Sequence, residues 1–93
     1  MTKLDKQHLN ELYTAILSLK TTEECDKFFE DICTIQELES LSQRLQVAKM
    51  LKTGLSYSEV NKQTGASTAT ICRVGKCINY GNGGYEMVID RIK

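Results

Sequence analysis

The chain has 93 residues, with 12 basic and 12 acidic side chains and no proline. This length predicts a single domain over residues 1–93 with a small core. No apolar run is long enough to cross a membrane, and the start, MTKLDKQHLN, lacks the apolar segment of a signal peptide. These features predict a cytoplasmic protein.

Apolar residues recur at helical spacing, which predicts an all-α fold of about six helices. Thr21 with Glu24, and Thr34 with Glu37, have the spacing of a capping box at a helix start. Gly54 is expected to end the third and longest helix as a left-handed cap. The expected helices cover residues 5–19, 22–33, 35–53, 57–63, 68–79 and 85–92. The third helix carries a strong apolar stripe, which consists of Leu38, Leu41, Leu45, Ala48 and Leu51.

Residues 56–79 are predicted to form a helix-turn-helix. Ser56 and Glu59 have capping-box spacing, which begins the first motif helix. Gly65 suits the turn because reversals between helices often need a positive φ. Ser67 is a good N-cap for the second motif helix.

The side chains of this motif separate into an inner and an outer set. The residues expected to point inward are Val60, Ile71 and Val74. Ala66 and Ala69 are small, which would let the two helices approach closely. The outer set of the second helix is Ser67, Thr68, Thr70, Arg73 and Lys76. Short hydroxyl side chains and cations are suited to base edges and phosphates.

The charges are unevenly distributed along the chain. Residues 1–39 carry four basic and nine acidic side chains, a net charge of −5, whereas residues 40–80 carry six basic and one acidic side chain, a net charge of +5. The positive block coincides with the helix-turn-helix and the helix before it. A local basic field of this kind attracts polyanions. It predicts that the partner is double-stranded DNA and that the protein is associated with the nucleoid.

The roles expected on DNA follow from these side chains. Thr68 and Thr70, at the N-terminal end of the second motif helix together with Ser67, would reach base edges. The expected phosphate contacts are Lys52, Lys62, Arg73 and Lys76. Ser56 and Tyr57 would donate hydrogen bonds to the DNA backbone.

The apolar faces of the first, second and last helices are large for so short a chain. We expect residues 1–33 to interleave with a second copy in a homodimer, which would cover these faces. Two recognition helices would then lie about one DNA turn apart. Residues 34–55 would form the central helix, and residues 80–93 a glycine-rich break followed by a closing helix.

Residues 34–79 resemble the Trp repressor superfamily of bacterial DNA-binding proteins, and most closely its YerC/YecD branch. The matching motifs are T-x-x-E-x-E-x-L at 34–41, Arg44, Gly54 followed by Leu55-Ser56, and G-A-S-T-A-T-I-x-R at 65–73. The resemblance implies an intertwined, all-helical homodimer that regulates transcription.

The resemblance also implies a pocket for an effector at Thr34, Arg44, Arg73 and Cys77. We do not expect tryptophan, the ligand of the repressor, to be the effector of this chain. Val74 stands where the repressor has a glycine under the indole, Cys77 replaces a serine, and Gln46 replaces a further arginine. Another, unknown small-molecule effector stays open, as does the alternative that Arg44 and Arg73 bind phosphates or acidic side chains.

Two other function classes compete with a DNA-binding regulator. The alternative is a protein-interaction module whose helix-turn-helix no longer binds DNA, which zero net charge and the acidic first third favour. An enzyme is not expected, because the one histidine, His8, has no serine or cysteine nucleophile beside it in the sequence. Four cysteines without a C-x-x-C pair predict no metal site and no cofactor, although redox sensing at Cys72 and Cys77 stays open.

Overall fold

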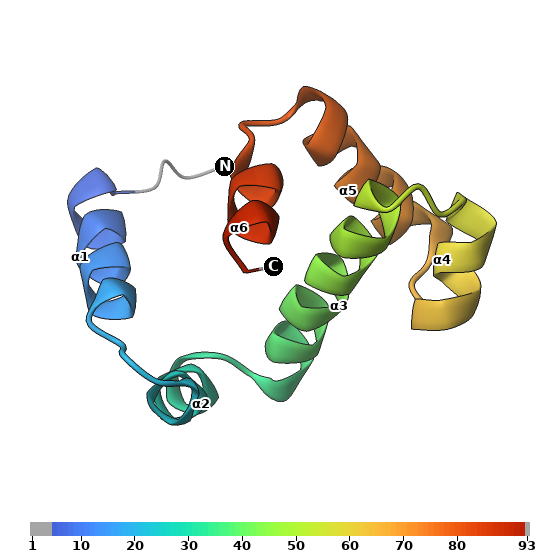
Figure 1. The fold of residues 1–93 in the computed structure, drawn as a ribbon. Coiled ribbons are helices and arrows are strands. Elements are labelled where there is room, and N and C mark those ends of the chain that lie inside the picture. Colours follow the sequence, from blue (N-terminus) through green and yellow to red (C-terminus); the bar gives the residue numbers. More distant parts are fainter. Residues whose placement is uncertain (1–4, 93) are drawn as a thin grey trace. The chain divides into compact units, whose positions relative to one another are not determined.

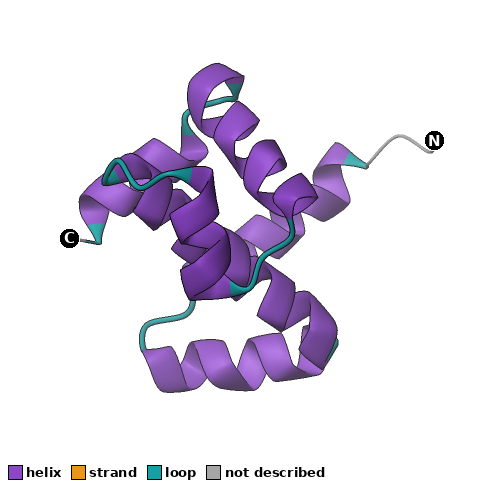
Figure 2. Ribbon diagram, turned by 90° about the vertical axis from the view of Figure 1, so that its right-hand side faces the viewer, coloured by secondary structure: helices purple, strands orange, loops and turns teal. Residues whose placement is uncertain are grey.

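The computed structural model describes residues 5–92, and this part of the chain contains six helices and no strand (Figures 1 and 2). The helices are α1 (Lys6–Leu17), α2 (Thr22–Ile32), α3 (Ile35–Lys52), α4 (Tyr57–Thr64), α5 (Thr68–Tyr80) and α6 (Gly84–Arg91). The all-α prediction is confirmed, with each helix end close to its expected position. None of the described helices is both long and apolar enough to cross a membrane.

The helix starts follow the predicted capping residues. At α3 the box is complete, because the Glu37 N–H donates to Thr34 Oγ1 at 3.1 Å and the Thr34 N–H donates to Glu37 Oε1 at 2.8 Å. At α2 the Glu24 N–H donates to Thr21 Oγ1, but the Glu24 carboxylate accepts from the N–H of Lys20, one residue earlier than the box requires. Local side-chain bonds therefore set both starts.

The chain divides into two compact units, with the division between Leu38 and Glu39. In the first unit, α1 and α2 contain no buried residue. Leu17 is 84% exposed, and Tyr13 and Ile32 are about half exposed. An exposed apolar surface of this kind is a feature of protein interfaces.

The second unit has a core shared by α3, α4, α5 and α6. Its buried side chains are Val47, Ala48, Val60, Ala66, Ile71, Val74 and Ile89. The inward positions predicted for the helix-turn-helix are confirmed. One expectation is wrong: Ala69 is exposed, so it is not packed between the two motif helices. On α3, Leu41 of the apolar stripe is 48% exposed, whereas Val47 is fully buried.

The turn between α4 and α5 is held by side-chain hydrogen bonds. Gly65 has a φ of +72°, the left-handed conformation predicted for it. Asn61 Nδ2 donates to the Ala66 carbonyl at 2.7 Å, and the Thr64 hydroxyl accepts the Ala66 N–H at 3.1 Å. Gln43 of α3 donates to the Thr64 carbonyl at 3.4 Å. These bonds fix the geometry of the helix-turn-helix on α3.

Candidate nucleic-acid interface

The N-terminal end of α5 presents three neighbouring hydroxyl groups. Ser67 caps the helix: its Oγ accepts the Thr70 N–H at 3.2 Å and its hydroxyl donates to Thr70 Oγ1 at 3.1 Å. Thr68 is exposed in the first turn, and Thr70 is half-buried. Backbone N–H groups and the positive end of the helix dipole lie at the same place, which favours an anion such as a phosphate.

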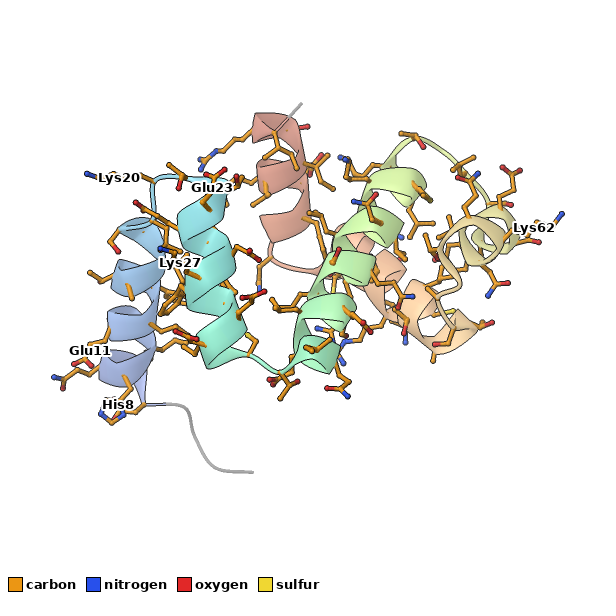
Figure 3. The ribbon with its side chains drawn as sticks, turned by 90° about the horizontal axis from the view of Figure 1, so that it is seen from below. His8, Glu11, Lys20, Glu23, Lys27 and Lys62 are labelled. Carbon is orange, nitrogen blue, oxygen red and sulfur yellow. The ribbon has the colours of Figure 1, made fainter. Side chains whose placement is uncertain are left out.

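Exposed cations lie on both helices of the motif. Lys62 is on α4, where its side chain points away from the rest of the unit (Figure 3). Arg73 and Lys76 are exposed on α5. The structure thus places three of the four cations expected at phosphates on the surface of the helix-turn-helix.

Lys52, the fourth of these cations, has a partner that its sequence surroundings do not indicate. Its Nζ lies 3.1 Å from the Glu86 carboxylate of α6, and its side chain is only 26% exposed. To contact a phosphate, Lys52 would have to leave this ion pair.

The start of α4 contacts the middle of α5. Ser56 is the N-cap of α4, and its Oγ accepts the Glu59 N–H at 3.2 Å. The phenol of Tyr57, which is 45% exposed, lies against Gly75, and a Cβ at that glycine would overlap the tyrosine hydroxyl. Tyr57 is therefore both a surface residue and a brace between the two motif helices.

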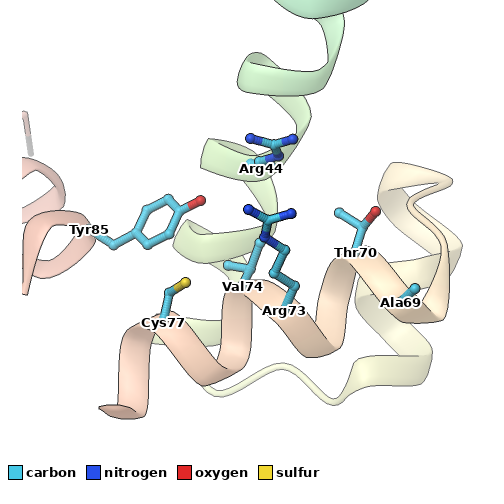
Figure 4. A pocket seen from close by; sticks show the side chains of 7 residues that line it. All are labelled: Arg44, Ala69, Thr70, Arg73, Val74, Cys77 and Tyr85. Atoms are coloured by element: carbon cyan, nitrogen blue, oxygen red, sulfur yellow. The ribbon is translucent and has the colours of Figure 1, made fainter. Parts of the chain in front are cut away.

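A hollow of about 270 Å³ lies between α3, α5 and α6 (Figure 4). Its lining consists of Arg44, Ala69, Thr70, Arg73, Val74, Cys77 and Tyr85. Three of the four residues expected in an effector pocket line this hollow, and the fourth, Thr34, belongs to the first unit, where it caps α3. Tyr85 was not expected, since nothing in its sequence surroundings indicates which helix it faces.

The single histidine of the chain lies on the first helix of the first unit. His8 is exposed on α1, and its Nδ1 lies 3.6 Å from the Asp5 carboxylate. The other labelled side chains of the first unit in Figure 3 are exposed as well: Glu11, Lys20, Glu23 and Lys27. The carboxylates at the start of α2 lie in its first turn, where the helix dipole favours negative charge.

Comparison with known proteins gives consistent results over nearly the whole chain. Residues 7–93 match the family model described as Trp repressor protein. The chain is 56% identical to the uncharacterised protein YerC of Bacillus subtilis over 91 residues, which is 98% of this chain and 88% of YerC.

Two solved structures have the same fold. A TrpR-like protein from Eubacterium eligens ATCC 27750 superposes with a TM-score of 0.90 and 53% identity, covering 92% of this chain and 89% of that one. A candidate Trp repressor from Staphylococcus aureus also gives a TM-score of 0.90, with 52% identity over 92% of this chain and 86% of that one. The chain belongs to the Trp repressor family, with YerC among its relatives.

Proposed function

We propose that this protein is a sequence-specific, double-stranded DNA-binding regulator of transcription that acts as a homodimer and does not respond to tryptophan. The observation that carries the proposal is the exposed N-terminal end of α5, with its hydroxyl groups, beside exposed cations on α4 and α5. An α-helix fits the major groove, and its N-terminal residues are the ones that commonly reach base edges.

The docking follows from this arrangement. Ser67, Thr68 and Thr70 meet base edges, and the Ser67–Thr70 hydroxyl bond can be exchanged for bonds to bases. The cations at phosphates are Lys62, Arg73 and Lys76, with Lys52 once it leaves Glu86. Ser56 and Tyr57 donate to the DNA backbone at the start of α4.

The homodimer is supported by the first unit. Its two helices leave their apolar side chains without a covering layer, and Leu17 is the most exposed of them. A second copy of the chain would bury these faces and give two recognition helices for the two halves of a palindromic site.

The proposal that tryptophan is not the effector rests on Val74. This branched side chain is 1% exposed and lines the hollow, so an indole has no flat glycine surface to lie against. Isothermal titration of the purified protein with tryptophan is expected to give no measurable heat of binding. Tight binding would contradict this part of the proposal.

The salt dependence of DNA affinity tests the proposed docking. Log affinity falls as log salt rises, because each phosphate that the protein binds releases condensed counterions. Removal of one phosphate-binding side chain should make this negative slope less steep by about one unit. We expect this reduction for Lys62→Gln and for Lys76→Gln. The measurement is fluorescence anisotropy with a labelled duplex between about 50 and 200 mM salt.

A matched control separates phosphate binding from overall charge. Lys20→Gln removes the same charge from an exposed position in the first unit, and should leave the slope unchanged. If Lys62 and Lys76 can both be replaced without loss of affinity, the docking is wrong. Absence of affinity for any duplex would favour the protein-interaction module instead.

A further inference from the structure

The hollow contains positive charge that is not neutralised by the described part of the chain. Arg44 and Arg73 extend toward the same space from α3 and α5 (Figure 4). Among residues 5–92, neither guanidinium takes part in an ion pair or a side-chain hydrogen bond. Two cations held beside one hollow repel each other and attract an anion, and guanidinium groups bind carboxylates in a bidentate manner.

A nucleophile shares this space. Cys77 lines the hollow and is exposed, so a dissolved reagent can reach its sulfur. Cys72 lies on the same helix and is also exposed, but it is not part of the lining. Both cysteines are therefore exposed, and only Cys77 lines the hollow with the arginine pair.

We propose that Cys77 is a site of reversible S-thiolation by small disulfides that carry carboxylates. The Cys77 thiol loses its proton to solvent, and its sulfur attacks one sulfur of the reagent. A new S–S bond forms to Cys77 while the S–S bond of the reagent breaks. The departing sulfur leaves with the electron pair as a thiolate, so Cys77 is oxidised and the departing sulfur is reduced. A free thiol reverses the step.

The arginine pair selects the reagent by charge. A carboxylate of the disulfide binds Arg44 or Arg73 and holds the S–S bond near Cys77. The hollow, at about 270 Å³ and open to solvent, has room for one carboxylate-bearing arm. A cationic disulfide offers the same sulfur chemistry but is repelled. The inference does not depend on DNA binding, and its test contains no DNA, so the two proposals can fail separately.

The experiment compares two probes on the reduced full-length protein. Oxidised glutathione carries net negative charge and cystamine carries positive charge. Trypsin under non-reducing conditions places Cys72 on residues 63–73 and Cys77 on residues 77–91, so mass spectrometry measures the two adducts separately. The rate of adduct formation at Cys72 corrects for the different intrinsic reactivities of the two probes. We expect the Cys77-to-Cys72 rate ratio to be about tenfold higher with glutathione disulfide, and to fall as salt screens the charges.

Substitutions test the role of the arginines. Arg44→Gln should bring the preference of Cys77 close to that of Cys72, whereas Lys49→Gln, which removes one exposed charge of α3 outside the hollow lining, should leave it unchanged. Circular dichroism checks that Arg44→Gln folds, and the exposed Arg73→Gln provides a second variant with the same expectation. Equal ratios for the two probes, or an unchanged preference in both arginine variants, would overturn the proposal.

Discussion

Gly75 lies inside α5, a position where alanine normally stabilises a helix by about 0.5–1 kcal/mol. Here a Cβ would overlap the Tyr57 hydroxyl. We predict that Gly75→Ala raises the free energy of unfolding in a Tyr57→Ala background. In the wild type the gain is cancelled or reversed, because overpacking costs about 1–3 kcal/mol. Urea unfolding of the four proteins in this double-mutant cycle measures the coupling. Equal effects in both backgrounds would show that the Tyr57–Gly75 approach does not constrain the helices.

The contacts that the sequence does not predict have one physical cause in common. The Lys52–Glu86 ion pair joins side chains 34 positions apart, and Tyr85 lines the same hollow as the arginines because α6 packs on α5. Such contacts depend on the angles between helices, which local spacing does not encode. Ala69 departs from its expected role for the same reason: its size is compatible with a close helix contact, but its position on α5 faces the hollow.

At the scale of helices, most of the structure could be predicted because the signals are local. Capping side chains, apolar spacing and positive-φ glycines lie within a few residues of the ends they determine. Ser56, Ser67 and Thr34 all cap the helices expected to follow them. The helix-turn-helix was therefore predictable, and so was its inner face.

The cap of α5 allows stability to be separated from DNA binding. Aspartate is as good an N-cap as serine, so Ser67→Asp should keep the free energy of unfolding near that of the wild type. Its carboxylate would enter the groove of the negatively charged DNA, and affinity measured by anisotropy should fall strongly. Ser67→Ala is the matched control, and should cost about 1 kcal/mol of stability. Wild-type affinity in Ser67→Asp would mean that this end of α5 does not meet DNA.

At the scale of the molecule, the first unit has apolar helix faces that are exposed in a single chain. Apolar periodicity predicted the helices, but a single sequence does not specify which surface covers them. Leu17 is 84% exposed on α1. We expect the wild type to sediment at twice the 10.5 kDa chain mass. Leu17→Glu should shift it toward the monomer, since burying an unpaired carboxylate is unfavourable.

A second substitution on the same helix controls for the added charge. Asn10→Glu places a carboxylate at an exposed polar position of α1 and should leave the sedimentation unchanged. A wild-type monomer at high concentration, or a Leu17→Glu protein that sediments like the wild type, would contradict the proposed dimer.

Selection of fragmented genomic DNA by the purified protein, sequenced at two salt concentrations, tests the central claim most directly. A homodimeric reader of base edges predicts enrichment of a palindromic site that persists at the higher salt, because base contacts add affinity beyond counterion release. Diffuse enrichment that disappears at the higher salt would contradict sequence-specific regulation and leave only electrostatic attraction to the basic surface of α4 and α5.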